Sequence, residues 1–278
     1  PTKERKEAAP MRVTWTTRML FDNSALVATF DGNTIAQMLA AKASDSSELT
    51  ADRLIVRLKR VKTDAASSSD TELASLAGSS DLGLDTIEAD GKVVASGSQT
   101  GPDGKMLTQM LLTKTEKLLY SDSDHQLTIP GPGQMLLIDN RPEKAAGGNG
   151  AAGGGNNARG ETAFEWAGKL VYNQRDNTVE LSKSVHMVHQ PQKAIRAGGN
   201  PATSHVDLST EHLLAKLSQP KDLENATALA NPVGVGAGGN QQLENVRADG
   251  GATLTLDNKQ ELRADVLTYD NSTHIATA

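Results

Sequence analysis

The 278-residue sequence contains no cysteine, and this absence removes several kinds of chemistry at once. Disulfide bonds, zinc sites built on thiolates and cysteine nucleophiles all require that side chain. Aromatic residues make up only 3% of the chain, so a core has to be built mainly from Leu, Val, Ile, Met and Ala. Broad aromatic stacking surfaces, which many sugar-binding and single-strand-binding proteins use, are therefore not expected.

Long apolar runs and a surplus of positive charge are also missing. No run approaches the roughly 18 residues that a membrane-spanning helix needs, and residues 1–10 have neither an initiator methionine nor a hydrophobic signal core. We expect a soluble chain without a membrane span, either a mature form or an excised fragment, with residues 1–10 as an N-terminal tail. The net charge of -6 argues against a nucleic-acid partner, because binding phosphates requires a basic surplus.

Apolar and polar residues alternate through most of the chain, which is the period of a half-buried strand. In residues 11–21, Val13, Met19 and Phe21 alternate with polar or charged neighbours, and residues 162–172 repeat the pattern. Short breaks rich in Asp, Asn and Gly separate such stretches, and we expect hairpin turns there. The breaks are DNSA at 22–25, FDGN at 30–33, EADGK at 88–92, GPDGK at 101–105, NQRDN at 173–177, RADGG at 247–251, DNKQ at 257–260 and YDNST at 269–273.

Two segments, 34–46 and 209–220, contain Leu, Ala and Lys, which intrinsically favour helix. We nevertheless expect strands in both, because the second is the counterpart of the alternating stretch at 47–60. The predicted fold class is therefore all-β.

An internal duplication organises the chain. SELTADRLIVRLKR (47–60) resembles VDLSTEHLLAKLSQ (206–219), and LDTIEADG (84–91) resembles LENVRADG (243–250). Both matches have the same offset, since 207 minus 48 and 243 minus 84 are each 159. Trp15 and Trp166 pair at an offset of 151, and loops can absorb the difference of eight residues.

We therefore expect two tandem copies of one β module, at residues 11–142 and 161–278. The glycine-rich stretch 143–160 has no periodicity and is expected to be a linker or an exposed loop. The second copy ends earlier than the first, so either it borrows strands from a neighbour or the chain was cut from a longer protein. We favour the cut, because a missing closing strand leaves an exposed edge.

Several of these motifs resemble the repeating unit of the organic-solvent-tolerance (OstA/LptA-like) family. They are LTADRLIVRL (49–58), IEADGKVVASG (87–97) and LRADVLTYDNSTHIATA (262–278). The resemblance implies tandem antiparallel β-jellyroll or β-taco modules stacked end to end, with an apolar groove between two sheets. It also implies a periplasmic or other extracytoplasmic protein that transports lipopolysaccharide or binds another lipid, with end-to-end self-association or further modules as partners.

Alternation selects the residues that would line such a groove: Met19, Phe21, Leu54, Val56, Leu58, Leu170, Tyr172, Leu213, Ala215 and Leu217. The alternative is that they simply pack a filled core, as a stripe of this kind does in every β-sandwich. A basic run is the candidate site for an anionic head group: Arg53, Arg57, Lys59, Arg60 and Lys62. A solvated edge strand protected by charge is the competing interpretation of that run.

No arrangement of residues indicates catalysis, a cofactor or a metal. His186 and His189 are three residues apart on an expected strand, which puts them on opposite faces. There is no Gly-x-Ser-x-Gly nucleophile motif and no phosphate-binding loop. We therefore expect a non-enzymatic lipid carrier. The alternatives are a structural or adhesive β-repeat scaffold with a filled core and, with less support, a polysaccharide-binding sandwich.

Overall fold

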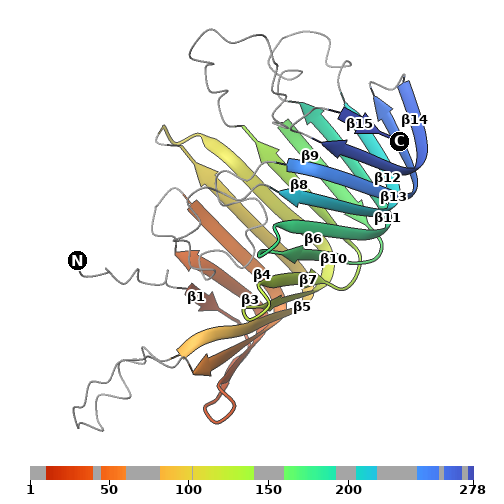
Figure 1. Ribbon diagram of the computed structural model, residues 1–278. Helices are drawn as coiled ribbons and strands as arrows, with labels where there is room; N and C mark the ends of the chain where they lie inside the picture. The colour runs from red at the N-terminus through yellow and green to blue at the C-terminus, as the bar shows by residue number, and fades with distance from the viewer. Residues whose placement is uncertain are drawn as a thin grey trace, which may run out of the picture.

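The computed structural model describes residues 11–39, 45–60, 82–101, 103–140, 160–191, 205–217, 243–256, 260–270 and 275–278. Within these ranges the chain forms strands and turns and no helix, which confirms the all-β prediction (Figure 1). The described parts of 34–46 and 209–220 are strands, as expected. The described residues contain no helix long and apolar enough to cross a membrane. The expected tail at 1–10, the linker at 143–159 and Lys62 lie outside the described residues.

The strands form a single antiparallel sheet. The first eight are β1 (Met11–Thr14), β2 (Arg18–Asp22), β3 (Val27–Leu39), β4 (Asp45–Arg60), β5 (Leu82–Thr100), β6 (Met106–Ser121), β7 (Gln126–Ile129) and β8 (Gly133–Asp139). The remaining seven are β9 (Gly160–Trp166), β10 (Leu170–Asn173), β11 (Thr178–Pro191), β12 (Val206–Leu217), β13 (Leu243–Leu256), β14 (Gln260–Asp270) and β15 (Ile275–Thr277).

Each long strand bends near its middle, where its register with the next strand shifts. Between β3 and β4, for example, the pairing jumps from Asp31 to Thr34. Residues in the left-handed backbone region mark these bends: Gly32, Asn33, Gly91, Lys92, Lys114, Lys183, Ser184, Gly250 and Gly251. A bulge with such a residue lets the strand turn sharply while pairing continues on both sides. The aligned bends form one corner along the sheet.

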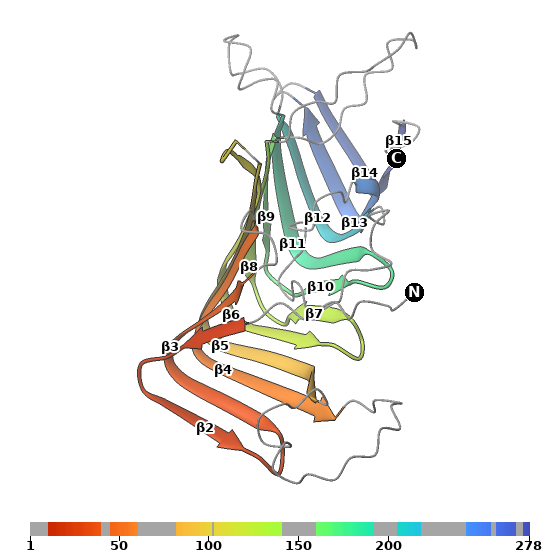
Figure 2. The same cartoon turned by 90° about the vertical axis from the view of Figure 1, so that its left-hand side faces the viewer.

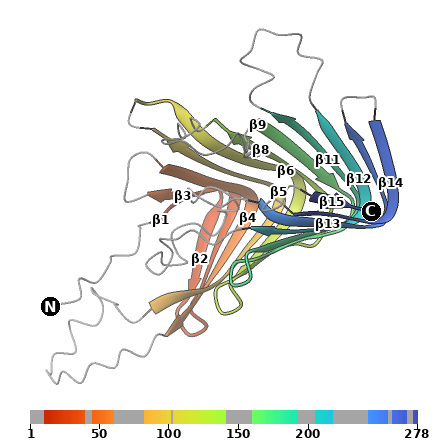
Figure 3. The ribbon, with the colours of Figure 1, turned by 45° about the horizontal axis from the view of Figure 1, so that its top comes forward.

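The corner divides the sheet into two walls (Figure 2). Wall A comprises β1, 34–39, 45–50, 93–100, 106–113, β8, β9, 185–191, 206–209, 252–256 and 260–264. Wall B comprises β2, 27–31, 53–60, 82–90, 115–121, β7, β10, 178–182, 212–217, 243–249, 266–270 and β15. In both walls the strands lie side by side, from the red N-terminal end of the sheet to the blue C-terminal end (Figure 3).

The bends correct part of the turn prediction. DNSA and NQRDN do connect strands, β2 to β3 and β10 to β11. In contrast, FDGN, EADGK and RADGG lie inside β3, β5 and β13 and produce the corner rather than hairpins. The same Asp, Asn and Gly residues suit both roles, because both need a residue with positive φ.

The sheet continues without interruption from the first strands to the last. β7 pairs with β10 in wall B, and β8 pairs with β9 in wall A. We refer to β1–β8 as the N-terminal half and β9–β15 as the C-terminal half. Buried residues of both halves belong to one hydrophobic cluster.

Contacts at the corner recur in the two halves. The Thr16 amide donates a hydrogen bond to the Gly32 carbonyl at 2.8 Å. The Ala167 amide donates to the Lys183 carbonyl at 2.9 Å, and both partners are shifted by 151 (167 minus 16, 183 minus 32). The tryptophan offset in the sequence therefore also relates backbone contacts in the structure.

In a second recurring hydrogen bond, the donors are related by one of the two sequence offsets and the acceptors by the other. The Leu58 amide donates to the Leu26 carbonyl at 2.9 Å, and the Leu217 amide donates to the Asn177 carbonyl at 2.8 Å. The donors differ by 159 (217 minus 58) and the acceptors by 151 (177 minus 26). Leu26 and Asn177 also share an unusual positive φ, 54° and 52°.

Candidate functional site

We call the face of each wall that is turned toward the other wall its inner face. The inner face of wall B carries two rows of apolar residues that cross the sheet, one residue per strand. Because side chains alternate along a strand, cross-strand neighbours in an antiparallel pair share a face. The first row is Met19, Phe30, Leu54, Ala89, Leu118, Ile129, Leu170, Leu181, Leu213, Ala248 and Leu267. The second is Phe21, Ala28, Val56, Ile87, Tyr120, Leu127, Tyr172, Val179, Ala215, Val246 and Tyr269.

All ten residues proposed from the sequence to line a groove lie on this one wall. Eight of them belong to the two rows. Leu58 and Leu217 lie two residues beyond Val56 and Ala215, toward the edge of wall B that is farthest from the corner, which we call its free edge. Leu54, Val56, Leu170, Tyr172 and Leu213 are buried; Leu58, Ala215 and Leu217 are partly buried and pack against the core. Met19 and Phe21, on β2, are each 43% exposed.

Wall A contributes a facing row that the sequence reasoning missed. Its members are Val13, Ala36, Leu49, Ala95, Leu112, Met135, Phe164, Met187, Leu208, Leu254 and Leu262. Alternation in 106–113 and 133–139 would have revealed part of it. The inner surface of the bent sheet is therefore apolar on both walls and across both halves.

The exposed large apolar residues of the described chain lie at the two ends of the sheet. They are Met11, Trp15, Met19, Leu20 and Phe21 at the N-terminal end, and Leu256, Leu262 and Val266 at the C-terminal end. In the described sheet, β1 and β2 pair only with β3, and β15 pairs only with β14. Each end therefore presents an unpaired strand edge together with uncovered apolar side chains.

The basic residues proposed as a head-group site do not form one cluster. Arg53 and Arg57 alternate with the buried Leu54 and Val56, so they lie on the outer face of wall B. Lys59 lies near the free edge of the wall, where its ammonium pairs with the Asp122 carboxylate at 2.8 Å. Arg60 ends β4 and is exposed.

Arg53 has a structural partner on the outer face. Arg18 and Arg53 donate to opposite oxygens of the Asp31 carboxylate, at 2.7 and 2.6 Å. The hydrogen bond from Arg18, and then the one from Arg53, lower the pKa of Asp31. This three-residue ion pair links β2, β3 and β4 just below the corner.

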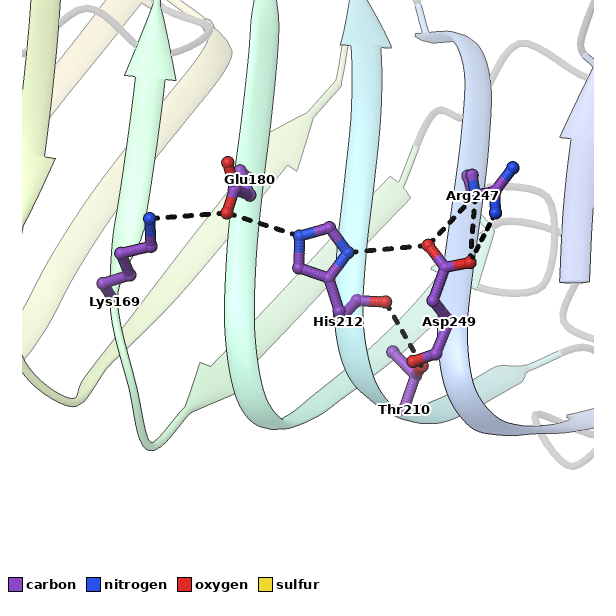
Figure 4. A network of polar contacts seen from close by, with 6 residues as sticks. All are labelled: Lys169, Glu180, Thr210, His212, Arg247 and Asp249. Carbon is purple, nitrogen blue, oxygen red and sulfur yellow. Dashed lines mark hydrogen bonds and ion pairs between the residues drawn. The ribbon is translucent and has the colours of Figure 1, made fainter. Parts of the chain in front are cut away.

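The C-terminal half carries a related network of outer-face side chains, Lys169, Glu180, His212, Arg247 and Asp249, which the buried Thr210 joins from the corner (Figure 4). His212 lies between two carboxylates, with Nε2 3.3 Å from Glu180 and Nδ1 3.6 Å from Asp249. Arg247 Nε donates to Asp249 at 2.9 Å, and this bond is the main cause of the lowered pKa of Asp249. His212 corresponds to Arg53 at the offset of 159 (212 minus 53), so a histidine in the C-terminal half takes the place of an arginine in the N-terminal half.

Two histidines of β11 lie on opposite faces, as their spacing predicts. His186 Nε2 on the outer face contacts the Asp207 carboxylate at 3.0 Å. His189 on the inner face of wall A forms a 2.8 Å hydrogen bond with the Thr162 hydroxyl. Burial lowers the pKa of His189, because loss of hydration disfavours the charged imidazolium. No group of three or more metal-ligating side chains occurs among the described residues.

Comparison with known proteins gives one kind of match. No family model and no curated protein sequence matches the chain. Among solved structures, the chain is similar to LptH from Pseudomonas aeruginosa, the LptA-homologous periplasmic component of a lipopolysaccharide transport device. The match has 14% sequence identity and a TM-score of 0.31, and it covers 59% of this chain and 76% of LptH. At that TM-score the similarity carries no argument about activity, which has to be built from the inner face itself.

Proposed function

We propose that the protein is a non-enzymatic, extracytoplasmic lipid carrier that holds acyl chains, including those of lipopolysaccharide, between walls A and B. The observation that supports this is the pair of apolar inner surfaces, which continue from strand to strand across both halves. None of the three rows contains a charged residue. An acyl chain could therefore pass from one half to the next without desolvating a charge.

The energetics suit a mobile ligand. Removing a methylene group from water contributes about 0.8 kcal/mol, and the contribution depends little on which aliphatic side chains surround it. Neighbouring strands lie roughly 4.8 Å apart, so successive residues of a row offer similar contacts at short intervals. Such a surface binds hydrocarbon firmly without fixing its position along the sheet.

The ends of the sheet support a bridge rather than an isolated carrier. A second copy, or a further β module, that paired with β1 and β2 would cover the exposed Trp15, Met19 and Phe21 and would extend the inner rows. We propose that the two halves of this chain, at 11–142 and 161–278, are themselves such related modules. The recurring corner bonds support that division.

Only the part of the basic run at the free edge of wall B remains proposed as a contact for an anionic head group. Lys59 and Arg60 end β4 at the edge of wall B farthest from the corner, where an anionic group would emerge from between the walls. Arg53, Arg57 and, by alternation, Lys59 belong to the outer face. Lys62 remains part of the proposed site by sequence alone.

Photo-crosslinking tests the lipid proposal with a matched control on each strand. A photoreactive residue at Val56 or Leu213, on the inner face, should crosslink to acyl chains when the protein is incubated with lipopolysaccharide. The same residue at Ile55 or Leu214 should not, because these neighbours lie on the outer face. Equal labelling at all four positions, or labelling at none, would contradict the proposal.

The alternative is a scaffold whose inner face is a filled core. The low exposure of Leu54, Leu170 and Leu213 favours it, since such values are typical of protein interiors. A scaffold would show concentration-dependent end-to-end association in solution scattering and no acyl adduct at Val56 or Leu213. Adducts at these positions would exclude it.

A further inference from the structure

Two buried hydroxyl groups on β6 lack hydrogen-bond partners. The oxygens are Oη of Tyr120 and Oγ1 of Thr108, and neither has a partner in the part of the chain that the structure describes. The residues are 1% and 7% exposed. A buried hydroxyl without a partner typically costs about 1–3 kcal/mol, so such groups are rare unless something else satisfies them.

Other buried threonines of the described sheet are satisfied. Thr34 donates to the Phe30 carbonyl at 3.3 Å, and Thr115 donates to the Lys117 carbonyl at the same distance. Thr210 donates to the Asp249 carbonyl at 2.7 Å. These three hydroxyls lie at the corner, where bulges free backbone carbonyls. Thr108 is far from the corner and has no such acceptor.

The two unpartnered hydroxyls occupy matching positions on the two walls. Lys114 is the corner residue of β6, with φ 56°, and each hydroxyl residue is six positions away (120 minus 114, 114 minus 108). Tyr120 belongs to the second inner row of wall B, between Ile87 and Leu127. Thr108 lies on the inner face of wall A with the buried Met110 and Leu112, and it is the farthest of the three from the corner. Both therefore point into the space between the walls, one from each side, near the middle of the sheet.

We propose that Tyr120 and Thr108 give the protein a preference for acyl chains that carry neutral hydrogen-bonding groups, hydroxyl or amide, over plain hydrocarbon chains. The proposal rests on the proposed lipid function. A ligand entering between the walls replaces the side chains that cover these oxygens, and a hydroxyl or amide on the chain then supplies the missing partner.

The surroundings of Tyr120 explain why the group should be neutral. Burial first, and then the nearby Asp122 carboxylate, raise the pKa of Tyr120 to about 12, although no hydrogen bond of normal geometry joins the two groups. The phenol thus remains protonated and can either donate or accept. Lys59 already balances the charge of Asp122 at 2.8 Å. A carboxylate on the ligand would therefore lose its hydration beside Tyr120 without gaining an unpaired cation, whereas burying a hydroxyl or amide costs far less.

The test compares two ligands of equal length, the methyl esters of tetradecanoic acid and of 3-hydroxytetradecanoic acid. Wild-type protein should bind the hydroxylated ester roughly tenfold more tightly, in keeping with one buried hydrogen bond gained. Tyr120→Phe and Thr108→Val remove only the hydroxyls and should reduce this preference, measured in each variant as the ratio of its affinities for the two esters. Thr210→Val, which removes a hydroxyl that already has a partner, should keep the preference.

The outcomes separate this proposal from the function on which it rests. If neither ester binds, the lipid function itself is wrong. If both bind equally to wild type, or if the double variant Tyr120→Phe/Thr108→Val keeps the preference, only the hydroxyl proposal is wrong. Melting temperature gives an independent check, because removing an unpartnered hydroxyl should leave the unliganded protein as stable as before or slightly more stable. A clear loss in both variants would show that the hydroxyls have partners of their own and would overturn the proposal.

Discussion

The two tryptophans occupy corresponding places in the two halves, yet their surroundings differ. Trp15 directly follows β1, the first strand of its half, and Trp166 is the last residue of β9, the first strand of the other half. Trp15 is 42% exposed and contacts Phe30, with ring centroids 5.2 Å apart. Trp166 is 1% exposed, and its indole nitrogen donates to the Gly131 carbonyl at 3.0 Å. The difference arises because β9 pairs with β11 on one edge and with β8 on the other, whereas β1 pairs with β3 alone in the described sheet.

The next strand of each half shows the same contrast. Met19 and Phe21 on β2 are largely exposed, whereas their counterparts Leu170 and Tyr172 on β10 are buried beside β7. Corresponding residues are thus equally apolar but unequally covered. The presence of a neighbouring strand, more than the identity of the side chain, decides burial in this sheet. The β1–β2 edge therefore has the composition of an internal strand without its neighbour.

The largest expected effect comes from truncating the two tryptophans. Trp166→Ala should lower the free energy of unfolding by about 3–5 kcal/mol, because it leaves a cavity and an unpaired Gly131 carbonyl. Trp15→Ala should cost about 1 kcal/mol or less, since Trp15 is 42% exposed and the change removes a partly exposed contact with Phe30. Urea unfolding followed by circular dichroism measures both. If Trp166→Ala does not fold, Trp166→Phe provides a milder version of the same change.

Equal losses for the two alanine variants would contradict the comparison. They would mean that Trp15 is covered in solution, for example by association of the β1–β2 edge. Repeating the measurement at low protein concentration would separate that case, since the Trp15 effect should then shrink.

The corner glycines should behave alike in the two halves. A Cβ at Gly91 would lie 2.8 Å from the Asp52 Cβ, and one at Gly250 would lie 2.9 Å from the Glu211 Cβ. Both glycines also have positive φ. Gly91→Ala and Gly250→Ala should each cost about 1–3 kcal/mol from backbone strain and steric overlap. Thermal unfolding measures the losses.

Gly251→Ala is the matched control for this pair. Gly251 has φ +81°, but its added Cβ would meet no atom within 4 Å. It should therefore show only the backbone strain, about 1 kcal/mol. A loss as large as that of Gly250→Ala would show that the close approach to Glu211 contributes nothing.

A smaller effect is expected from His189, which has no polar counterpart in the N-terminal half. At the offset of 151 the register pairs Met11 with Met38, where the C-terminal half pairs Thr162 with His189. Because burial lowers the pKa of His189, the unfolded chain takes up the proton first as the pH falls below about 6.5. The contribution of His189 to stability should therefore be fully present above pH about 6.5, and it should decrease as the pH falls from there toward the pKa of His189 in the folded protein.

His189→Met makes the C-terminal half resemble the N-terminal half and should remove this part of the decline. Melting temperatures at pH 7.5 and 5.5 test it, with His186→Gln on the outer face of the same strand as the control. An unchanged difference between the two pH values in His189→Met would assign the decline to other groups.

The smallest effect concerns the carboxylates of the outer networks. Hydrogen bonds from arginine lower the pKa of Asp31 in one half and of Asp249 in the other, so each adds stability above pH about 3.8 that is lost as the pH falls through the folded pKa. Asp31→Asn and Asp249→Asn should shift the midpoint of acid unfolding only slightly, because the arginines paired with them are exposed and solvent screens these pairs. A shift that survives 0.5 M salt would contradict a surface ion pair.

Much of the fold could be predicted from the sequence because its signals are local. Alternation identified the strands, and the shared offset placed Leu54 and Leu213 on corresponding strands, where both now lie in the same inner row. The corner was missed because an Asp-Gly pair inside a strand looks like a hairpin turn. Only the pairing on both sides of Gly91 and Gly250 shows that the strand continues.

The candidate site was predicted less completely, for two physical reasons. The wall A row includes small residues such as Ala36 and Ala95, which give a weak apolar signal even when fully enclosed. The basic run was grouped by proximity in sequence, although alternation with Leu54 and Val56 already puts Arg53 and Arg57 on the opposite face. The unpartnered hydroxyl of Tyr120 leaves no trace in the sequence, because it depends on which groups surround it.

Backbone pairing across the middle of the sheet has a mechanical consequence. Since β7–β10 and β8–β9 join the halves by the same ladders that hold each half together, one half could swing about the other only by breaking backbone hydrogen bonds. Heat or denaturant should then melt the whole sheet in one cooperative transition. A load applied across the strands, from one end of the sheet to the other, would pass through every ladder in turn, so the weakest ladder would set the force at which the sheet opens.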